Sequence, residues 1–101
     1  MAPPWHRGRI VLVGDAAHAT TPHLASGAAI SVEDAIVLVE ELERAASVEA
    51  ALTAYVARRF ERCKMVVENS LRLGEIEISG GSKDEHSQVM RDSMIALLAP
   101  I

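Results

Sequence analysis

RIVLVGDAAH, residues Arg9 to His18, places an apolar run rich in β-branched residues directly before a glycine and an aspartate. The segment Ile10–Val13 predicts one strand buried on both faces, as in the parallel sheets of α/β domains. Ligands of such sheets bind at the carboxyl ends of the strands. Gly14 and Asp15 follow at that end, so we expect one carboxylate that can accept hydrogen bonds from ligand hydroxyls. The alternative is that Asp15 only caps an ordinary strand-to-helix turn.

The composition describes a small, acidic chain with an aliphatic core. Of the 101 residues half are hydrophobic but only 3% are aromatic, which favours packed helices. The net charge of -4 excludes the basic surface that nucleic acids require. No apolar run approaches the roughly 20 residues of a transmembrane helix. The start of the chain lacks the apolar segment of a secretory signal, and the single Cys63 cannot form an internal disulfide, so we expect a cytoplasmic protein.

A first helix is predicted over Gly27 to about Arg44, after a loop over residues 19–25 that contains Pro22. Ser26 is expected to cap this helix. Its apolar residues recur at helical spacing, so we expect them to face the core. They are Ala28, Val32, Ala35, Leu38, Val39 and Leu42.

Two further helices are predicted in the second half of the chain. Ser47 caps the first of them, which should stop at Gly74 and be followed by a linker over residues 75–81. Its apolar stripe comprises Leu52, Val56, Phe60, Cys63, Val67 and Leu71. The capping box that begins at Ser82 starts the last helix, which continues through Leu97 until Pro100.

The predicted fold is therefore mainly α, with one buried strand followed by three helices. We divide it into residues 1–46, with the strand, loop and first helix, and residues 47–101, a helical region. A single buried strand needs neighbours to satisfy its backbone groups. We therefore expect further strands from a missing N-terminal portion or from a partner.

The remaining polar residues give weaker signals. His18 and His23 flank the loop near Asp15, but no His-x-x-x-His helix or cysteine pair supports a metal site, so His18 is expected to be a structural hydrogen-bonding residue. Cys63 is expected to be a small core residue. No Gly-x-Ser-x-Gly elbow indicates a hydrolase. A solvated or ion-paired face, with an intrahelical pair between Glu68 and Arg72, is expected for the arginines Arg58, Arg59, Arg62 and Arg72.

Several of these segments together resemble one family. Trp5, the segment Arg7–His18, Pro22, Gly27 and the segment Val32-Glu33-Asp34-Ala35 resemble the second flavin-binding segment of FAD-dependent aromatic-ring hydroxylases. These are single-component flavoprotein monooxygenases similar to para-hydroxybenzoate and salicylate hydroxylases. The resemblance extends from Trp5 to about Leu42, and the later helices fit the family's C-terminal helical region with weaker motifs.

The resemblance implies a cofactor and a reaction. Asp15, next to Gly14, would bind a ribityl hydroxyl of FAD, and the loop from Pro22 would pass beside the isoalloxazine ring. Backbone amides at the helix start, those of Gly27, Ala28 and Ala29, would face the pyrimidine edge of the flavin. In such enzymes NADH or NADPH reduces the flavin, and oxygen is then used to hydroxylate a small aromatic substrate.

The sequence departs from the family in two ways. Many members have Gly-x-Gly before the helix, where this chain has Ala25-Ser26-Gly27. The chain also lacks the Gly-x-Gly-x-x-Gly that cradles the pyrophosphate. We therefore interpret it as an FAD-binding segment that is inactive in isolation. The alternative is a non-enzymatic helical module that kept the scaffold and self-associates as a homo-oligomer.

Overall fold

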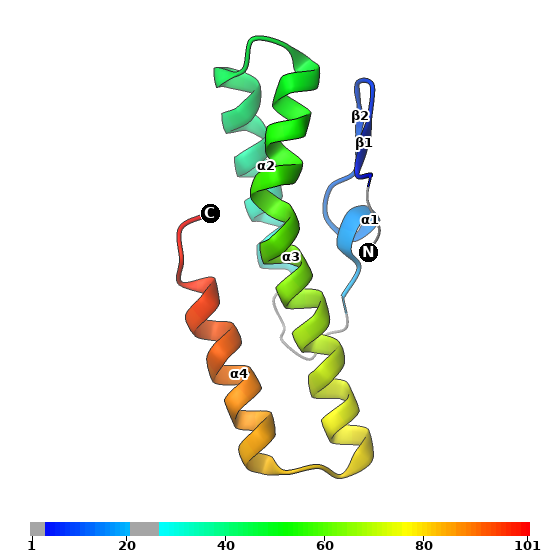
Figure 1. Ribbon diagram of the computed structural model, residues 1–101, viewed down its shortest axis with the longest axis vertical. Coiled ribbons are helices and arrows are strands. Elements are labelled where there is room, and N and C mark those ends of the chain that lie inside the picture. The colour runs from blue at the N-terminus through cyan, green and yellow to red at the C-terminus, as the bar shows by residue number, and fades with distance from the viewer. Residues whose placement is uncertain (1–3, 21–26) are drawn as a thin grey trace.

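The computed structural model describes residues 4–20 and 27–101. These residues form a short hairpin, one turn of helix and three longer helices (Figure 1). The elements are β1 (His6–Arg7), β2 (Ile10–Val11), α1 (Asp15–His18), α2 (Gly27–Arg44), α3 (Val48–Ser79) and α4 (Lys83–Leu97). The expectation of a mainly helical fold is confirmed.

The prediction of one strand over Ile10–Val13, buried on both faces, is wrong. Strand β2 has two residues and pairs antiparallel with β1, so that Arg7 lies opposite Ile10. The side chain of Ile10 is 73% exposed, and Leu12 and Val13 are exposed as well. The described residues give β2 a single neighbour, so its other edge and much of its apolar surface stay uncovered. Since the described residues contain no parallel sheet, the Rossmann-like part of the expectation is not confirmed.

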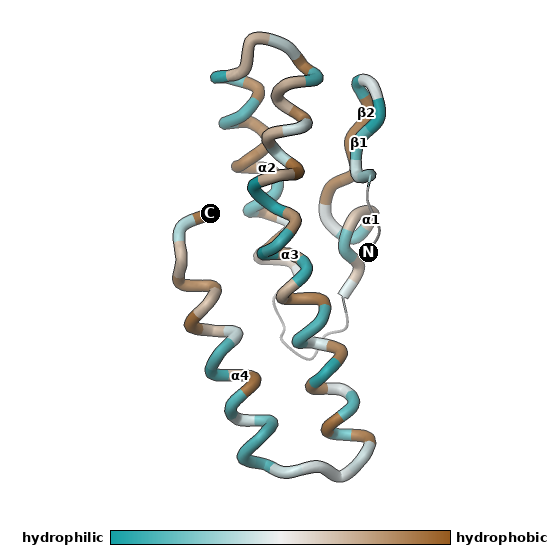
Figure 2. Tube along the Cα trace, viewed as in Figure 1, coloured by the Kyte–Doolittle hydropathy of each residue, from teal (hydrophilic) through white to brown (hydrophobic). Residues whose placement is uncertain are grey.

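Helix α2 packs on α3 through a face other than the apolar face predicted from the sequence. The buried residues of α2 are Ile30, Asp34, Val37 and Glu41, which include two carboxylates. We call the opposite, apolar side the outer face of α2; its residues Val32, Ile36, Val39 and Leu42 are between 46% and 61% exposed. Figure 2 shows hydrophobic residues recurring along this helix. The predicted helix is therefore confirmed, but most of its predicted core residues face outward.

Helix α3 is the longest element, with 32 residues, and α2 and α4 both pack against it (Figure 1). The predicted cap is confirmed, since the Ser47 hydroxyl accepts from the Ala50 amide at 3.1 Å. The predicted stop at Gly74 and linker over residues 75–81 are wrong. Gly74 is buried inside the helix, which ends at Gly80 in a left-handed conformation with φ 67°. A helical glycine costs only about 1 kcal/mol, which buried neighbours offset here.

Helix α4 begins as predicted and folds back along α3. The Ser82 hydroxyl accepts from the amides of Asp84 and Glu85 at 3.1 and 3.4 Å. Its last residue is Leu97, as expected. Of the helix's own residues only Ser93 is fully buried, so α4 is held mainly by partly buried side chains.

The core consists of two clusters along α3. The first gathers Trp5, Ala17, Val37, Tyr55 and Cys63, and the second gathers Ile30, Val66 and Leu73. Trp5 connects the hairpin to the helices, because its ring lies 5.6 Å from those of both His18 and Phe60. In the described part of the chain no helix combines the length and the hydrophobicity that a membrane span requires.

Candidate functional site: the Gly14–Asp15 turn and the start of α2

The turn at Gly14 and Asp15 connects the hairpin to α1. Gly14 adopts φ 60° and ψ -141°, a backbone conformation that essentially only glycine tolerates. Its carbonyl accepts from the amides of Ala17 and His18, both at 3.0 Å, and so starts α1. Asp15 is exposed, and its carboxylate makes no hydrogen bond or ion pair with the other described residues. The carboxylate therefore remains available to accept hydrogen bonds from a ligand.

Helix α2 packs against this turn and against the segment that follows α1. A side chain added at Gly14 would meet the Ser31 hydroxyl oxygen at 3.1 Å, and one added at Gly27 would meet Thr20 at 3.2 Å. The Ser31 hydroxyl donates to the Gly27 carbonyl at 2.9 Å. In both contacts a side chain packs tightly against a glycine backbone, which leaves little room for a Cβ atom.

The α2 start also has the exposure and charge that a ligand site needs. Ala28 and Ala29 are exposed, and the first turn of α2 carries no acidic side chain that would neutralise its positive end. That the predicted site residues form one ligand site stays a prediction. Five of the six lie within the described residues, namely Gly14, Asp15, Gly27, Ala28 and Ala29. The sixth, Pro22, lies outside the described residues.

Behind this turn lies a buried polar group that we call the Asp34 cluster. Asp34 Oδ2 accepts from the Gly14 amide at 3.0 Å and is hydrogen-bonded to His18 Nε2. Asp34 Oδ1 accepts from Arg59 Nε at 2.7 Å and from Cys63 Sγ at 3.7 Å. The side chains of this cluster are 1% exposed or less; they are Asp34, His18, Arg59 and Cys63. Three elements, α1, α2 and α3, therefore meet at a single carboxylate.

Charges within the cluster compensate each other. Burial disfavours the charged form of His18, but its hydrogen bonds to Asp34 and Cys63 outweigh this and raise its pKa to about 10. Burial likewise disfavours the Asp34 carboxylate, but hydrogen bonds from His18, Arg59 and the Gly14 amide lower its pKa to about 2. Glu33 also contacts Arg59, at 2.9 Å, so two cations face two carboxylates.

The expectation for His18 as a structural hydrogen-bonding residue is confirmed. Arg59 is ion-paired, one of the two predicted alternatives, but it is buried in the core. Its Nε donates to Asp34 and its Nη2 to Glu33, both acids of α2, whereas its buried Nη1 has no hydrogen-bond partner among the described residues. Arg72 does not form the expected pair with Glu68. It reaches Glu85 of α4 at 2.7 Å instead, because the fold brings α4 alongside α3.

The Asp34 cluster also has the outline of a metal site, since donor atoms of His18, Asp34 and Cys63 lie within 4.8 Å of one another. The charges argue against a cation there. The Arg59 guanidinium already occupies one oxygen of the carboxylate, and His18 is protonated. The arrangement is an ion-pair cluster. His23, the other histidine considered for a metal, lies outside the described residues.

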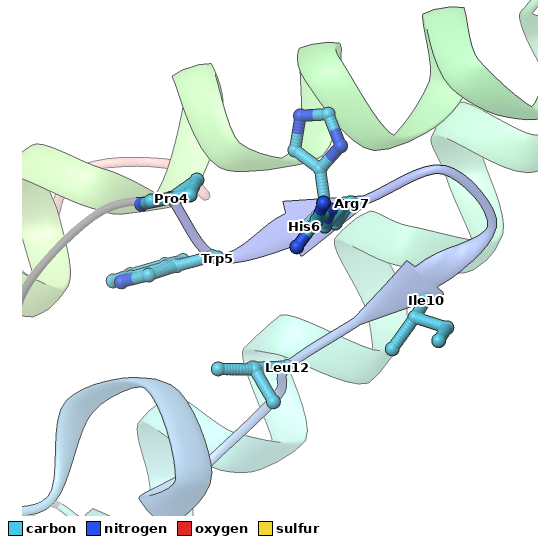
Figure 3. Close-up of a pocket in the computed structure, with 6 residues that line it drawn as sticks. All are labelled: Pro4, Trp5, His6, Arg7, Ile10 and Leu12. Atoms are coloured by element: carbon cyan, nitrogen blue, oxygen red, sulfur yellow. The ribbon is translucent and has the colours of Figure 1, made fainter.

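A hollow on the hairpin is a separate feature (Figure 3). It has a volume of about 200 Å³ and is lined by Pro4, Trp5, His6, Arg7, Ile10 and Leu12. This is below the roughly 300–1,000 Å³ of typical ligand pockets. Since neither Gly14 nor Asp15 lines the hollow, it does not form part of the candidate site.

Asp34 and Arg59 are the residues whose role sequence reasoning missed. The segment Val32-Glu33-Asp34-Ala35 contributed to the family resemblance without an assigned function. A signal was present, because two adjacent acids in one helix and two adjacent arginines, Arg58 and Arg59, in the next could have suggested pairing between the helices.

The Gly14–Asp15 turn presents an exposed carboxylate, and the first turn of α2 carries no acidic side chain. Such features suit a protein that binds a cofactor with hydroxyl and electron-rich groups. The sequence comparisons specify the cofactor. A family model described as an FAD binding domain matches residues 1–70. The chain belongs to this family, that of the FAD-dependent monooxygenases.

The similar proteins are monooxygenases from bacteria and fungi. A putative FAD-dependent monooxygenase of Bacillus subtilis is 49% identical over 77 residues, which cover 76% of this chain and 21% of that protein. Aurachin C monooxygenase/isomerase of Stigmatella aurantiaca is 47% identical over 72 residues, which cover 71% of this chain and 19% of that protein. The 6-hydroxynicotinate 3-monooxygenase of Pseudomonas fluorescens is 46% identical over 66 residues, which cover 63% of this chain and 17% of that protein.

The chain thus spans about a fifth of the length of these relatives. No solved structure matches it.

Proposed function

We propose that this chain contributes the ribityl and pyrimidine contacts of an FAD site in a monooxygenase that uses NADH or NADPH and hydroxylates a small aromatic substrate. Asp15 accepts a hydrogen bond from a ribityl hydroxyl. The amides of Gly27, Ala28 and Ala29 face the pyrimidine edge, and the loop containing Pro22 passes beside the ring. The observation that carries the proposal is the contact between Gly14, the neighbour of the unpaired Asp15, and Ser31, whose hydroxyl donates to the carbonyl of Gly27 at the start of α2.

The residues of this chain bind and orient the cofactor in the proposed site. FAD, when bound and reduced, supplies the chemistry of oxygen activation. The positive end of α2 stabilises negative charge at the pyrimidine edge, and it does so without reorganising because the helix is fixed. Gly14 lets the turn that carries Asp15 pack against Ser31 of α2, where a side chain would meet the Ser31 hydroxyl at 3.1 Å.

The rest of the site comes from a further part of the flavoprotein. The chain has no Gly-x-Gly-x-x-Gly for the pyrophosphate, and it spans about a fifth of its relatives. The outer face of α2, together with the exposed Ile10 and Val13, offers apolar surface that such a part can cover. In the proposed arrangement the 101 residues alone do not catalyse hydroxylation, and the assembled protein works in a reducing cytoplasm, in keeping with the free, buried Cys63.

A flavin titration tests the proposal. FAD is added to the 101-residue chain, alone and with the remainder of the Bacillus subtilis relative supplied as a separate polypeptide, and flavin fluorescence is followed. We expect binding in the mixture that Asp15→Ala weakens about tenfold, the loss of one or two charge-assisted hydrogen bonds. Asp84→Ala is the matched control, since Asp84 is also an exposed acid in the first turn of a helix. Equal affinities of the Asp15 and Asp84 variants would refute the proposal.

A second candidate function is that of a helical module that self-associates. The outer face of α2 favours it, because the four apolar side chains of this face are about half exposed in one continuous stripe. Sedimentation velocity over a range of concentrations distinguishes this module from the proposed flavin-binding segment. Dimers that persist after the complementary polypeptide is added, without any flavin bound, would favour the module.

A further inference from the structure

We propose that Asp34 is the positioning residue of the Gly14–Asp15 turn, holding Gly14 from beneath so that the Asp15 carboxylate points toward the cofactor. The inference rests on the proposed function in assigning flavin contact to Asp15. It adds a residue that touches no ligand and acts through the backbone of its neighbour.

The geometry connects Asp34 to the turn directly. Its Oδ2 takes the amide proton of Gly14, the residue immediately before Asp15, at 3.0 Å. The same oxygen binds His18, which ends α1, so one carboxylate oxygen holds both ends of the Gly14–His18 segment. A backbone hydrogen bond to a buried carboxylate is among the stronger kinds in proteins.

Gly14 is also restrained from the side of its Cα atom. The Ser31 side chain, three residues before Asp34 on α2, lies where a side chain of residue 14 would begin. Asp34 and Ser31 together fix Gly14 in its unusual backbone conformation. Because Asp15 has no partner of its own among the described residues, the direction of its side chain depends on this backbone.

A carboxylate is required at position 34, and an amide cannot replace it. Asp34 Oδ2 faces two donors, from Gly14 and His18, and Oδ1 faces two more, from Arg59 and Cys63. An asparagine has one accepting oxygen and would direct its NH₂ group at one of these donor pairs. Asp34→Asn therefore disturbs the turn with almost no change in side-chain volume.

Amide hydrogen exchange of the full 101-residue chain, measured by NMR, tests the inference without flavin. In the unmodified chain we expect the Gly14 amide to exchange at least about a hundredfold more slowly than that of Gly8, an exposed glycine of similar φ. Asp34→Asn should speed exchange at Gly14 about tenfold or more. Glu41→Gln is the matched control, because it removes another buried carboxylate of α2, the partner of Arg58, without touching the turn.

A double-mutant cycle on FAD affinity then asks whether Asp34 acts through Asp15. In the reconstituted flavin titration, Asp34→Asn should weaken binding about tenfold. In the Asp15→Ala background Asp34→Asn should have little further effect on FAD affinity, because the side chain through which Asp34 acts on the cofactor is already absent. Fully additive effects would overturn the inference.

The outcomes separate this inference from the proposed function. Fast exchange of Gly14 in the unmodified chain overturns the positioning role even if Asp34→Asn fails to fold. A folded Asp34→Asn chain with unchanged exchange at Gly14 overturns it as well. If the flavin binds but Asp15→Ala has no effect on affinity, or if no flavin binds at all, the proposed function fails. In that case the exchange data alone decide whether Asp34 holds the turn.

Discussion

Arg59 Nε donates to Asp34 Oδ1 across 2.7 Å, and both side chains are completely buried between α2 and α3. Two charges shielded from water in this way are strongly coupled, because each compensates the desolvation of the other. The pair also reaches beyond the helices, since the second oxygen of Asp34 holds Gly14. A change at Arg59 is therefore felt both in the helix packing and at the candidate site.

Removing the guanidinium should cost far more at Arg59 than at an exposed arginine. Arg59→Met leaves Asp34 with a buried charge that His18 compensates only in part, so we expect the free energy of unfolding to fall by about 3–5 kcal/mol. Urea denaturation followed by circular dichroism measures this loss. Arg72→Met is the control, because its pair with Glu85 is about half exposed and worth about 0–1 kcal/mol. Similar losses for the two variants would contradict the prediction.

The His18–Asp34 pair should give stability a maximum at mildly acidic pH. The folded chain keeps the His18 proton up to about pH 10, whereas an unfolded chain releases it near 6.5. The stabilisation is therefore complete below pH 6.5 and is lost as the pH rises toward about 10. Asp34 behaves oppositely. Its pKa lies near 2 instead of 3.8, so its contribution is complete above pH 3.8 and is lost as the pH falls toward about 2.

Unfolding free energies at several pH values test this maximum between pH 3.8 and 6.5. His18→Gln should abolish the alkaline decline, whereas His86→Gln, on the far end of the molecule, should retain it. The titratable groups that face His18 in the cluster are Asp34, Tyr55, Arg59 and Cys63, with Glu33 beyond Arg59. Burial raises the pKa of Tyr55, which keeps its hydroxyl protonated through the range. An alkaline decline that survives in His18→Gln would point to another group.

Alanine at Gly14 should be more destabilising than alanine at Gly8. Both residues have φ near 60°, which costs a residue with a side chain about 1–2 kcal/mol. Gly8 has open space around it, whereas a side chain at Gly14 meets the Ser31 hydroxyl at 3.1 Å. We expect Gly14→Ala to lose at least about 1 kcal/mol more. Adding Ser31→Ala should restore part of that difference, and equal losses at the two glycines would refute the prediction.

A charge placed on the outer face of α2 should prevent association through that face. Val39 is 54% exposed on this face, so Val39→Lys should not affect folding but should interrupt any apolar contact. We expect the variant to lose binding of the complementary polypeptide and any dimerisation, as followed by sedimentation velocity. Ile95→Lys is the matched control, at a 60% exposed apolar position on α4. Association unchanged by Val39→Lys would exclude the outer face as the contact.

The sequence predicted helices well because caps and stops act locally. Ser47 and Ser82 begin α3 and α4 as expected, since each hydroxyl satisfies amides of its own first turn. Gly74 was misread because a glycine stops a helix only where the following residues gain nothing by continuing it. Here Ile76 is buried two residues further on, and the helix reaches Gly80.

The inward face of α2 could not be predicted from its hydrophobicity. The helix has an apolar face and a mixed face, and a reading by hydrophobicity buries the apolar one. In the structure the mixed face is buried because Arg58 and Arg59 of α3 supply partners for Glu41 and Asp34. The candidate site, which a turn and a helix start identified in the sequence, stays a prediction. The boundary between residues 46 and 47 stays a prediction; it falls in the turn between two helices that pack together.

Because α3 runs through both core clusters while α4 buries only Ser93 of its own, the molecule should loosen in stages rather than all at once. At about 1.5 Å per residue the 32 residues of α3 span roughly 48 Å, close to the 50 Å length of the molecule. Helix α4 can detach from one end of α3 while the opposite end, where buried ion pairs join α2 to α3, stays folded. The Gly14–Asp15 turn is anchored in the half of the molecule that should unfold last.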